Sequence, residues 1–211
     1  MIQLDYVSFR RSLSWRLWRQ PSIVLLMLGI ASLNGVSCTR VDKKAQPEAP
    51  PPSLIVEETE GAKGLRKAGE RAPLFEGQLP DGKKFSLATL RDKIVILYFY
   101  PKNNTPGCTA EAKSFATHQV ELEQAGAVVV GVSGDDQESH NAFAEKYSLP
   151  FLLVSDKKGE LAKAYGVKRF LGMSQRVTFL IARDGTILKV YPEVRPEEHG
   201  AEILDDLRKV Q

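Results

Sequence analysis

A continuous apolar run at residues 94–100 is followed, eight residues after its end, by Cys108, the one cysteine beyond residue 38. An apolar run without alternation indicates a strand buried on both faces, as in the centre of a sheet covered by helices. Between the run and the cysteine stand Thr105, which can cap a helix, and Pro106, which fits the first helical position because it lacks an N–H. The sequence therefore predicts that Cys108 lies in the first turn of a helix beginning at residue 106.

A cysteine in the first turn of a helix has an unusual electrostatic environment. Free amide N–H groups and the positive end of the helix dipole surround its sulfur, and both favour the thiolate, the nucleophilic form of the side chain. Most lone cysteines are instead small buried apolar residues. The predicted helix start favours a reactive thiol at Cys108 over that structural alternative.

Beyond residue 65 the chain alternates predicted strands and helices. Two hairpins are predicted, at 75–79 with 84–87 and at 176–181 with 186–190, because an Asp-Gly pair lies in each connection. Apolar runs and helical spacing predict further strands at 94–100, 127–133 and 151–154, and helices at 106–124, 137–147, 158–165 and 196–210. This order predicts an α/β, thioredoxin-like fold, with a mixed central sheet flanked by helices and an N-terminal β-hairpin extension.

The first 38 residues have the charge order of an export signal. They hold four arginines and one acid, and the arginines precede an uncharged stretch at 20–39. Cys38 follows Gly35-Val36-Ser37, which resembles a bacterial lipoprotein processing site, although Gly35 stands where leucine is usual. Two interpretations remain open: lipidation at Cys38, or an uncleaved single membrane anchor. In both, the arginines stay cytoplasmic and the domain lies on the extracytoplasmic side, tethered or periplasmic.

A Pro-, Lys- and Glu-rich segment at 39–64 is typical of an extended linker, so the predicted organisation is a leader at 1–38, a linker at 39–64 and a domain at 65–211. Beyond residue 38 the chain holds 25 basic and 25 acidic residues. The overall charge of +3 therefore comes from the leader and gives no indication of nucleic-acid binding.

Thr105 occupies the position at which thioredoxin-type modules carry the first cysteine of Cys-x-x-Cys, so a dithiol cycle is unavailable here. A hydroxyl there can hydrogen-bond to a thiolate or to an oxygen substrate. The motif Pro101-x-x-x-Thr105-x-x-Cys108 resembles the active-site motif of peroxiredoxins. The stretch at 72–112 is similar to their Q-type, or bacterioferritin-comigratory, branch, and the resemblance extends over about 65–211.

The resemblance implies a thiol-dependent peroxidase and oxidoreductase that reduces hydrogen peroxide and small organic hydroperoxides, in antioxidant defence and without a cofactor. Cys108 would attack the peroxide O–O bond and Thr105 would orient the substrate. Arg176, in a matching segment at 175–180, would polarise the site together with the amides of Gly107 and Cys108. Pro101 would shield the sulfur. The structural alternatives are a strand-edge salt bridge for Arg176 and the end of a strand for Pro101.

Lys113 stands where many Q-type members carry a resolving cysteine, and no cysteine follows Cys108. The sequence therefore predicts a one-cysteine cycle, in which thioredoxin or a small thiol reduces the sulfenic acid on Cys108. A monomer or weak dimer is expected. The alternative function is a redox-inactive, membrane-tethered, thioredoxin-like binding module.

The remaining candidates are predicted to be structural. The three histidines have no spacing that pairs them as ligands, so no metal site is expected. Glu111 is interpreted as part of the helix-start network. Solvated turn charges are expected at Asp135, Asp136, Lys157 and Lys158. His199 is expected to help start the last helix or to face solvent.

Overall fold

The computed structural model describes residues 55–56, 64–78 and 84–209. The predicted leader, including Cys38, and most of the predicted linker lie outside these residues. Within the described ranges, no helix combines the length and the apolar character that crossing a bilayer requires.

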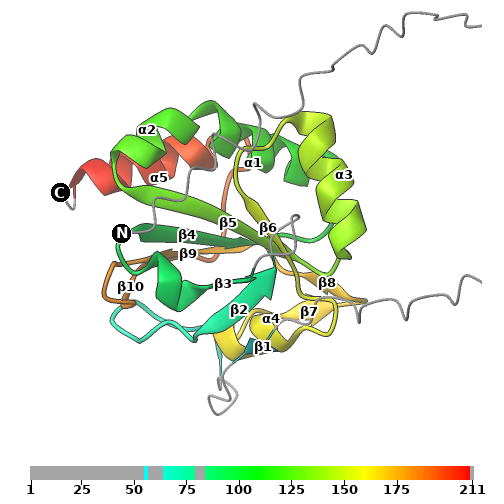
Figure 1. Ribbon diagram of the computed structural model, residues 1–211, viewed down its shortest axis with the longest axis horizontal. Coiled ribbons are helices and arrows are strands. Elements are labelled where there is room, and N and C mark those ends of the chain that lie inside the picture. The colour runs from blue at the N-terminus through cyan, green and yellow to red at the C-terminus, as the bar shows by residue number, and fades with distance from the viewer. Residues whose placement is uncertain (1–54, 57–63, 79–83, 210–211) are drawn as a thin grey trace, which may run out of the picture. The chain divides into compact units, whose positions relative to one another are not determined.

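A five-stranded mixed sheet forms the centre of the domain (Figure 1). Its strands lie in the order β10 (Ile187–Tyr191), β9 (Val177–Ile181), β4 (Ile94–Phe99), β5 (Ala127–Ser133) and β6 (Leu152–Ser155). β4 runs parallel to β5 and antiparallel to β9, and all six of its residues are buried. The predicted central strand is therefore confirmed, and its burial on both faces explains why its sequence is continuously apolar.

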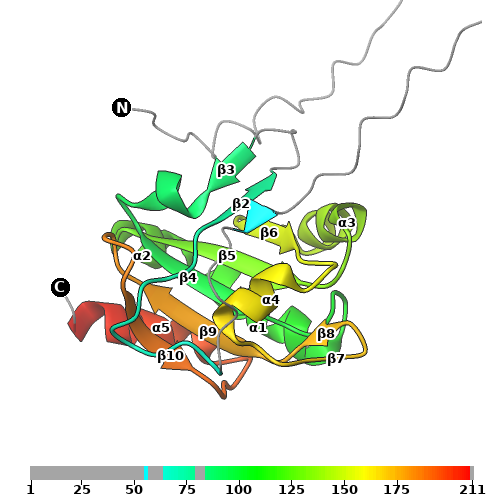
Figure 2. The same ribbon diagram turned by 90° about the horizontal axis from the view of Figure 1, so that it is seen from below.

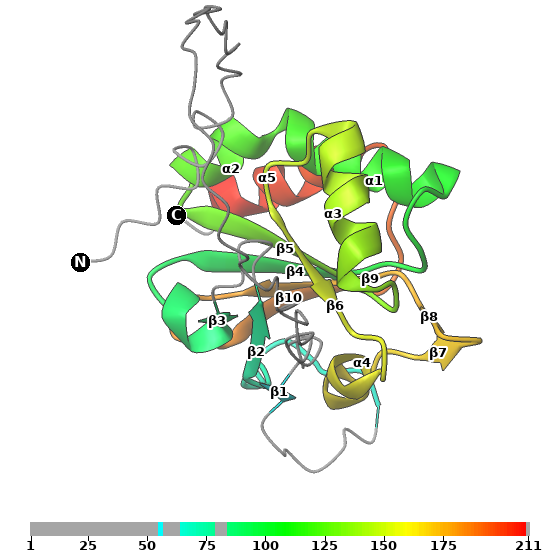
Figure 3. The ribbon, with the colours of Figure 1, turned by 45° about the vertical axis from the view of Figure 1, so that its right-hand side comes forward.

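Alternate side chains of β4 enter two separate cores. Ile96 and Tyr98 pack with Phe115 under α1 (Pro106–Thr117), α2 (Gln119–Gln124), α3 (Gln137–Tyr147) and α5 (His199–Lys209), which cover one face of the sheet (Figure 3). Leu97 and Phe99 join the core of the other face, below α4 (Glu160–Tyr165). The period of two along the strand thus gives the sheet two covered faces.

A smaller sheet lies on the α4 side of the central sheet, as the view from below shows (Figure 2). It consists of β1 (Ile55–Val56), β2 (Phe75–Gln78) and β3 (Lys84–Ser86), and a 3-10 helix, η2 (Leu87–Leu90), follows β3. β2 and β3 form the predicted N-terminal hairpin. The thioredoxin-like α/β class is confirmed. A short hairpin of β7 (Arg169–Phe170) and β8 (Met173–Ser174) was not predicted.

The predicted helix at 106–124 is wrong as a single element, because the chain bends at His118 between α1 and α2. The Thr117 hydroxyl donates to the Lys113 carbonyl at 2.9 Å, and back-bonding of this kind bends helices. The N–H of His118 donates to the carbonyls of both Ser114, at 3.4 Å, and Phe115, at 3.2 Å. α5 also begins three residues later than predicted, at His199.

A close approach at Gly200 fixes α5 against α1. The Gly200 N–H donates to the Ser114 hydroxyl at 3.0 Å, and a Cβ at this position would lie 2.6 Å from the Ser114 carbonyl oxygen. Only glycine leaves room for this contact. The contact matters for the chemistry because α1 carries Cys108.

Replacing this glycine should force α5 away from α1. We expect Gly200→Ala to lower the free energy of unfolding by about 1–3 kcal/mol, since the new methyl meets backbone that cannot rotate away. Urea unfolding measures the change. Gly64→Ala is the matched control, because no atom lies within 4 Å of a Cβ there. Equal stability of the two variants would contradict the role given to Gly200.

Candidate active site

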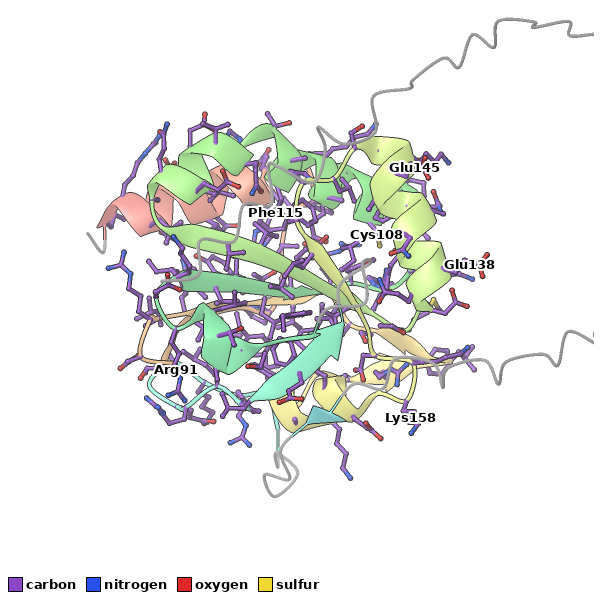
Figure 4. The ribbon with its side chains drawn as sticks, viewed as in Figure 1. Arg91, Cys108, Phe115, Glu138, Glu145 and Lys158 are labelled. Atoms are coloured by element: carbon purple, nitrogen blue, oxygen red, sulfur yellow. The ribbon has the colours of Figure 1, made fainter. Side chains whose placement is uncertain are left out.

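Cys108 lies in the first turn of α1, at the helix end that follows the carboxyl end of β4. Pro106 is the first helical residue, so the predicted helix start is confirmed. The cysteine side chain is only 1% exposed and belongs to the core under the helical layer. Figure 4 labels Cys108 on the side of the sheet that the helical layer covers. Burial keeps bulk water away from the sulfur, which strengthens any electrostatic contact that it makes.

Arg176 makes that contact. Its Nη2 donates to Cys108 Sγ at 3.3 Å, although 68 positions separate the two residues in the sequence. The guanidinium is always protonated and therefore places a fixed positive charge beside the sulfur. Gly107 lies beside the guanidinium, since a Cβ at this position would be in van der Waals contact with Nη2, at 3.4 Å. The structure thus brings Cys108, Gly107 and Arg176 together.

Glu111 holds the other arm of the same guanidinium. Nη1 of Arg176 donates to Glu111 Oε2 in a buried ion pair, while Glu111 Oε1 has no hydrogen-bond partner within the described residues. Burial raises the pKa of Glu111 to about 7, and the attraction of Arg176 offsets only part of that rise. The expected helix-start role of Glu111 is therefore wrong: its side chain fixes Arg176.

Thr105 precedes α1 but does not cap it through its side chain. Its hydroxyl donates to the Lys102 carbonyl at 3.1 Å, so the predicted side-chain cap is wrong. The physical reason is local: that carbonyl lies within the turn that leads into the helix and satisfies the hydroxyl. The Thr105 carbonyl still accepts the first helical bond, from the Thr109 N–H at 2.9 Å. Pro101 lies two positions after the end of β4 and is half-buried.

A buried polar network holds the loop between β4 and α1. Asn103 donates its N–H to Asp135 at 2.8 Å and its amide to Ser139 at 2.9 Å, and it accepts from Tyr100 at 2.7 Å. His140 contacts both Tyr100 and Asn103, and burial lowers the pKa of His140 to about 4, so it is neutral at pH 7. The loop before Cys108 is thereby joined to β5 and α3.

Sequence reasoning missed Asn103 and misassigned Asp135, which is a half-buried anchor and not a solvated turn charge. The only available signal was that both follow the ends of neighbouring parallel strands, which meet at one edge of the sheet. Asp136 is exposed, as expected, although it also caps α3 by accepting from the Ser139 N–H. Lys157 and Lys158 are exposed as expected.

His199 begins α5 and is fully buried, with ring contacts to Thr178 at 2.9 Å and Glu202 at 3.0 Å. In the part of the chain that the structure describes, no three His, Cys, Asp or Glu side chains are grouped to hold a metal ion. Around Cys108 the structure brings together one thiol, one guanidinium and the buried carboxyl group of Glu111.

Three comparisons place this arrangement among known proteins. The family model described as "AhpC/TSA family" matches residues 68–190. The peroxiredoxin Bcp of Bacillus subtilis is 39% identical over 148 residues, which cover 66% of this chain and 94% of that protein. The crystal structure of the peroxidoxin BcpB of Mycobacterium tuberculosis matches with a TM-score of 0.65 and 34% identity, covering 69% of this chain and 98% of that one.

A Xanthomonas campestris bacterioferritin comigratory protein, described in terms of its alkyl peroxide reduction activity, matches with a TM-score of 0.59 and 32% identity. That match covers 64% of this chain and 90% of the other. Family model, sequence relatives and solved structures all indicate the same family. The chain belongs to the AhpC/TSA family, as a peroxiredoxin of the Bcp or Q type, and is a thiol-dependent peroxidase.

Proposed function

We propose that this peroxiredoxin reduces hydrogen peroxide and small organic hydroperoxides through a sulfenic acid on Cys108. The thiolate sulfur attacks one peroxide oxygen, so an S–O bond forms as the O–O bond breaks. The departing oxygen takes a proton and leaves as water or an alcohol, and the sulfur is oxidised. The contact between Arg176 Nη2 and Cys108 Sγ, at 3.3 Å in a site almost closed to solvent, carries this proposal.

Each site residue has a distinct part in this proposal. Arg176 stabilises the thiolate before attack and the negative charge that develops on the departing oxygen. Glu111 is a positioning residue, because its carboxylate sets the direction of the guanidinium. Thr105 orients the substrate from the turn before α1, and Pro101 shields the sulfur. The near-complete burial of Cys108 favours compact hydroperoxides, in line with the alkyl peroxide reduction named for the Xanthomonas protein.

The return half of the cycle uses an external thiol. A reductant such as thioredoxin or a small thiol attacks the sulfenic sulfur, releases water and leaves a mixed disulfide, which a second thiol then resolves. Cys108 is the free cysteine of the described residues, and Lys113 occupies the position at which many Q-type proteins have a second one. We propose accordingly that turnover needs no second cysteine of this chain.

The proposed location is the extracytoplasmic side of a membrane. It is supported by the arginines followed by an uncharged apolar stretch within residues 1–38, with Cys38 as the candidate lipidation site. There the enzyme would act in antioxidant defence as a monomer or weak dimer.

Removing the sulfur tests the enzymatic proposal. We expect Cys108→Ser to lower peroxide consumption with a dithiol reductant by at least about a thousandfold, because a serine hydroxyl is not ionised at neutral pH. Cys38→Ser is the matched control and should keep full activity. Equal rates for wild type and Cys108→Ser would favour the redox-inactive binding module. Loss of turnover in Cys38→Ser, with a Cys38–Cys108 disulfide seen by non-reducing mass spectrometry, would overturn the one-cysteine cycle.

Replacing Arg176 by lysine tests whether its two simultaneous contacts are needed for activity. Arg176→Lys should lower kcat/KM for hydrogen peroxide by about a hundredfold, because one ammonium group cannot contact the thiol and Glu111 together. The exposed Arg183 supplies the control, since Arg183→Lys should change nothing. Unchanged kcat/KM in Arg176→Lys would show that only the charge, and not the two-armed contact, is needed.

The buried carboxylate predicts a pH dependence of stability. The pKa of Glu111 is raised from 4.5 to about 7, so the folded protein retains a proton that the unfolded chain releases between these values. The free energy of unfolding therefore falls as pH rises through this window, by on the order of 3 kcal/mol from this group. Urea unfolding at graded pH measures the slope, which should be smaller in Glu111→Gln. Identical slopes would contradict the raised pKa.

A further inference from the structure

The hairpin of β7 and β8 exposes large apolar side chains to solvent. Phe170 is 74% exposed and Leu171 is 82% exposed, and Met173 is also exposed. Figure 3 shows the hairpin projecting from the side of the domain. Scattered apolar residues on a surface need no explanation, but a group of three at one projecting tip is typical of a binding site.

Leu171, at the tip of the hairpin, has a backbone conformation that leucine disfavours. Phe170 pairs with Met173, so Leu171 and Gly172 form a two-residue loop, with φ of +49° and +81°. Loops with positive φ at both positions favour Asn-Gly, whereas leucine is disfavoured in this backbone region. Asparagine at position 171 would therefore be both more soluble and less strained than leucine. A leucine at a position that disfavours it indicates that its side chain has a function.

The hairpin is held firmly to the domain. Arg169 Nη2 donates to the Gly172 carbonyl at 2.6 Å and to the Lys157 carbonyl at 3.4 Å. A Cβ at Gly134 would lie 2.4 Å from the Gly172 carbonyl oxygen, and one at Gly159 would lie 1.9 Å from Arg169 Nη1. The tip of the hairpin is therefore exposed, while the residues next to it are packed against the domain.

The segment of the chain that contains the hairpin is basic. Residues 157–176 hold six lysines and arginines and a single acid, Glu160, although the chain beyond residue 38 is neutral as a whole. Lys157, Lys158, Lys163 and Lys168 are exposed. Exposed apolar side chains in a segment with exposed lysines match the structure of a lipid bilayer, in which anionic headgroups lie outside an apolar interior.

We propose that the β7–β8 hairpin docks the domain on an anionic lipid bilayer. Phe170, Leu171 and Met173 enter the boundary between headgroups and acyl chains, and the exposed lysines contact the headgroups. A second copy of the chain fits this surface less well, since a two-fold contact would bring two basic patches together. The tip is also convex, and lipid accommodates a projecting side chain without a preformed pocket.

Docking would also set how the site faces the membrane. Gln175 alone separates the hairpin from Arg176, so a docked hairpin holds the guanidinium and Cys108 in a fixed orientation relative to the bilayer. The leader predicted at residues 1–38 would keep the domain close to the same surface.

Vesicle binding tests the proposal on the fragment 48–211, which omits the apolar leader. This segment is one compact unit and contains the core residues of the described ranges. The match to the Bacillus peroxiredoxin covers 94% of that protein, which is shorter than this chain. The fragment therefore folds by itself. Co-sedimentation with vesicles of equimolar phosphatidylcholine and phosphatidylglycerol should recover the fragment, whereas vesicles of phosphatidylcholine alone should recover little. No peroxide is present, so the outcome is independent of the proposed peroxidase cycle.

Two tip variants sharpen the test. Leu171→Asn creates the favoured Asn-Gly turn, so it should unfold at the same or a higher urea concentration while vesicle affinity falls about fivefold or more. Phe170→Thr keeps a strand former and should weaken binding similarly. Val120→Asn is the matched control, because Val120 is 63% exposed on α2, and its binding should equal that of the wild type.

Three results would overturn the proposal. The first is no binding of the wild-type fragment to anionic vesicles, or binding by both tip variants that equals binding by the wild type. The second is a dimer in sedimentation velocity that both tip variants convert to a monomer, which would assign the hairpin to contact between copies. The third is unchanged vesicle binding with a raised KM for purified thioredoxin in Leu171→Asn, which would assign the tip to the reductant.

Discussion

The buried ion pair between Arg176 and Glu111 is the interaction on which the site depends. A charged guanidinium in a largely dry environment is stable only when its partner is fixed, and the carboxylate of Glu111 is fully buried beside it. The pair turns the second arm of the guanidinium toward the Cys108 sulfur. Because burial raises the pKa of Glu111 to about 7, the carboxyl keeps its charge only as long as Arg176 stays beside it and the pH stays above that value. The chemistry therefore rests on how α1 and β9 are held.

Packing on both faces of β4 supplies that rigidity. Its alternate side chains enter two cores, so α1 is fixed above the sheet while β9 is hydrogen-bonded beside it. Gly200 brings α5 directly against α1, and the network of Asn103, Asp135 and His140 holds the loop that leads to Cys108. These contacts place a cysteine and an arginine from distant parts of the chain within 3.3 Å. The fold thus positions the reactive groups before any substrate arrives.

The same arginine segment connects the site with the surface of the domain. β8 ends at Ser174, two positions before Arg176. The β7–β8 hairpin exposes apolar side chains and lies in a basic segment of the chain. Leu171 holds a backbone conformation that favours other residues, and the hairpin is nevertheless packed tightly on Gly134 and Gly159. If the hairpin docks on lipid as proposed, the reactive thiol of this peroxidase is held close to the membrane surface.

The sequence by itself determined the central strand, the helix start at Pro106 and the place of Cys108 in its first turn, because apolar burial and helix-start chemistry depend on neighbouring residues. It also placed Arg176 near the site through its resemblance to the Q-type peroxiredoxins. Only the tertiary structure decided that Glu111 pairs with Arg176, which lies 65 positions away, and that Thr105 bonds to Lys102 and does not cap the helix. It likewise decided the bend at His118 and the β7–β8 hairpin. Local patterns carry no information on which distant side chains share a buried space, since that is set by how the helices and the sheet pack together.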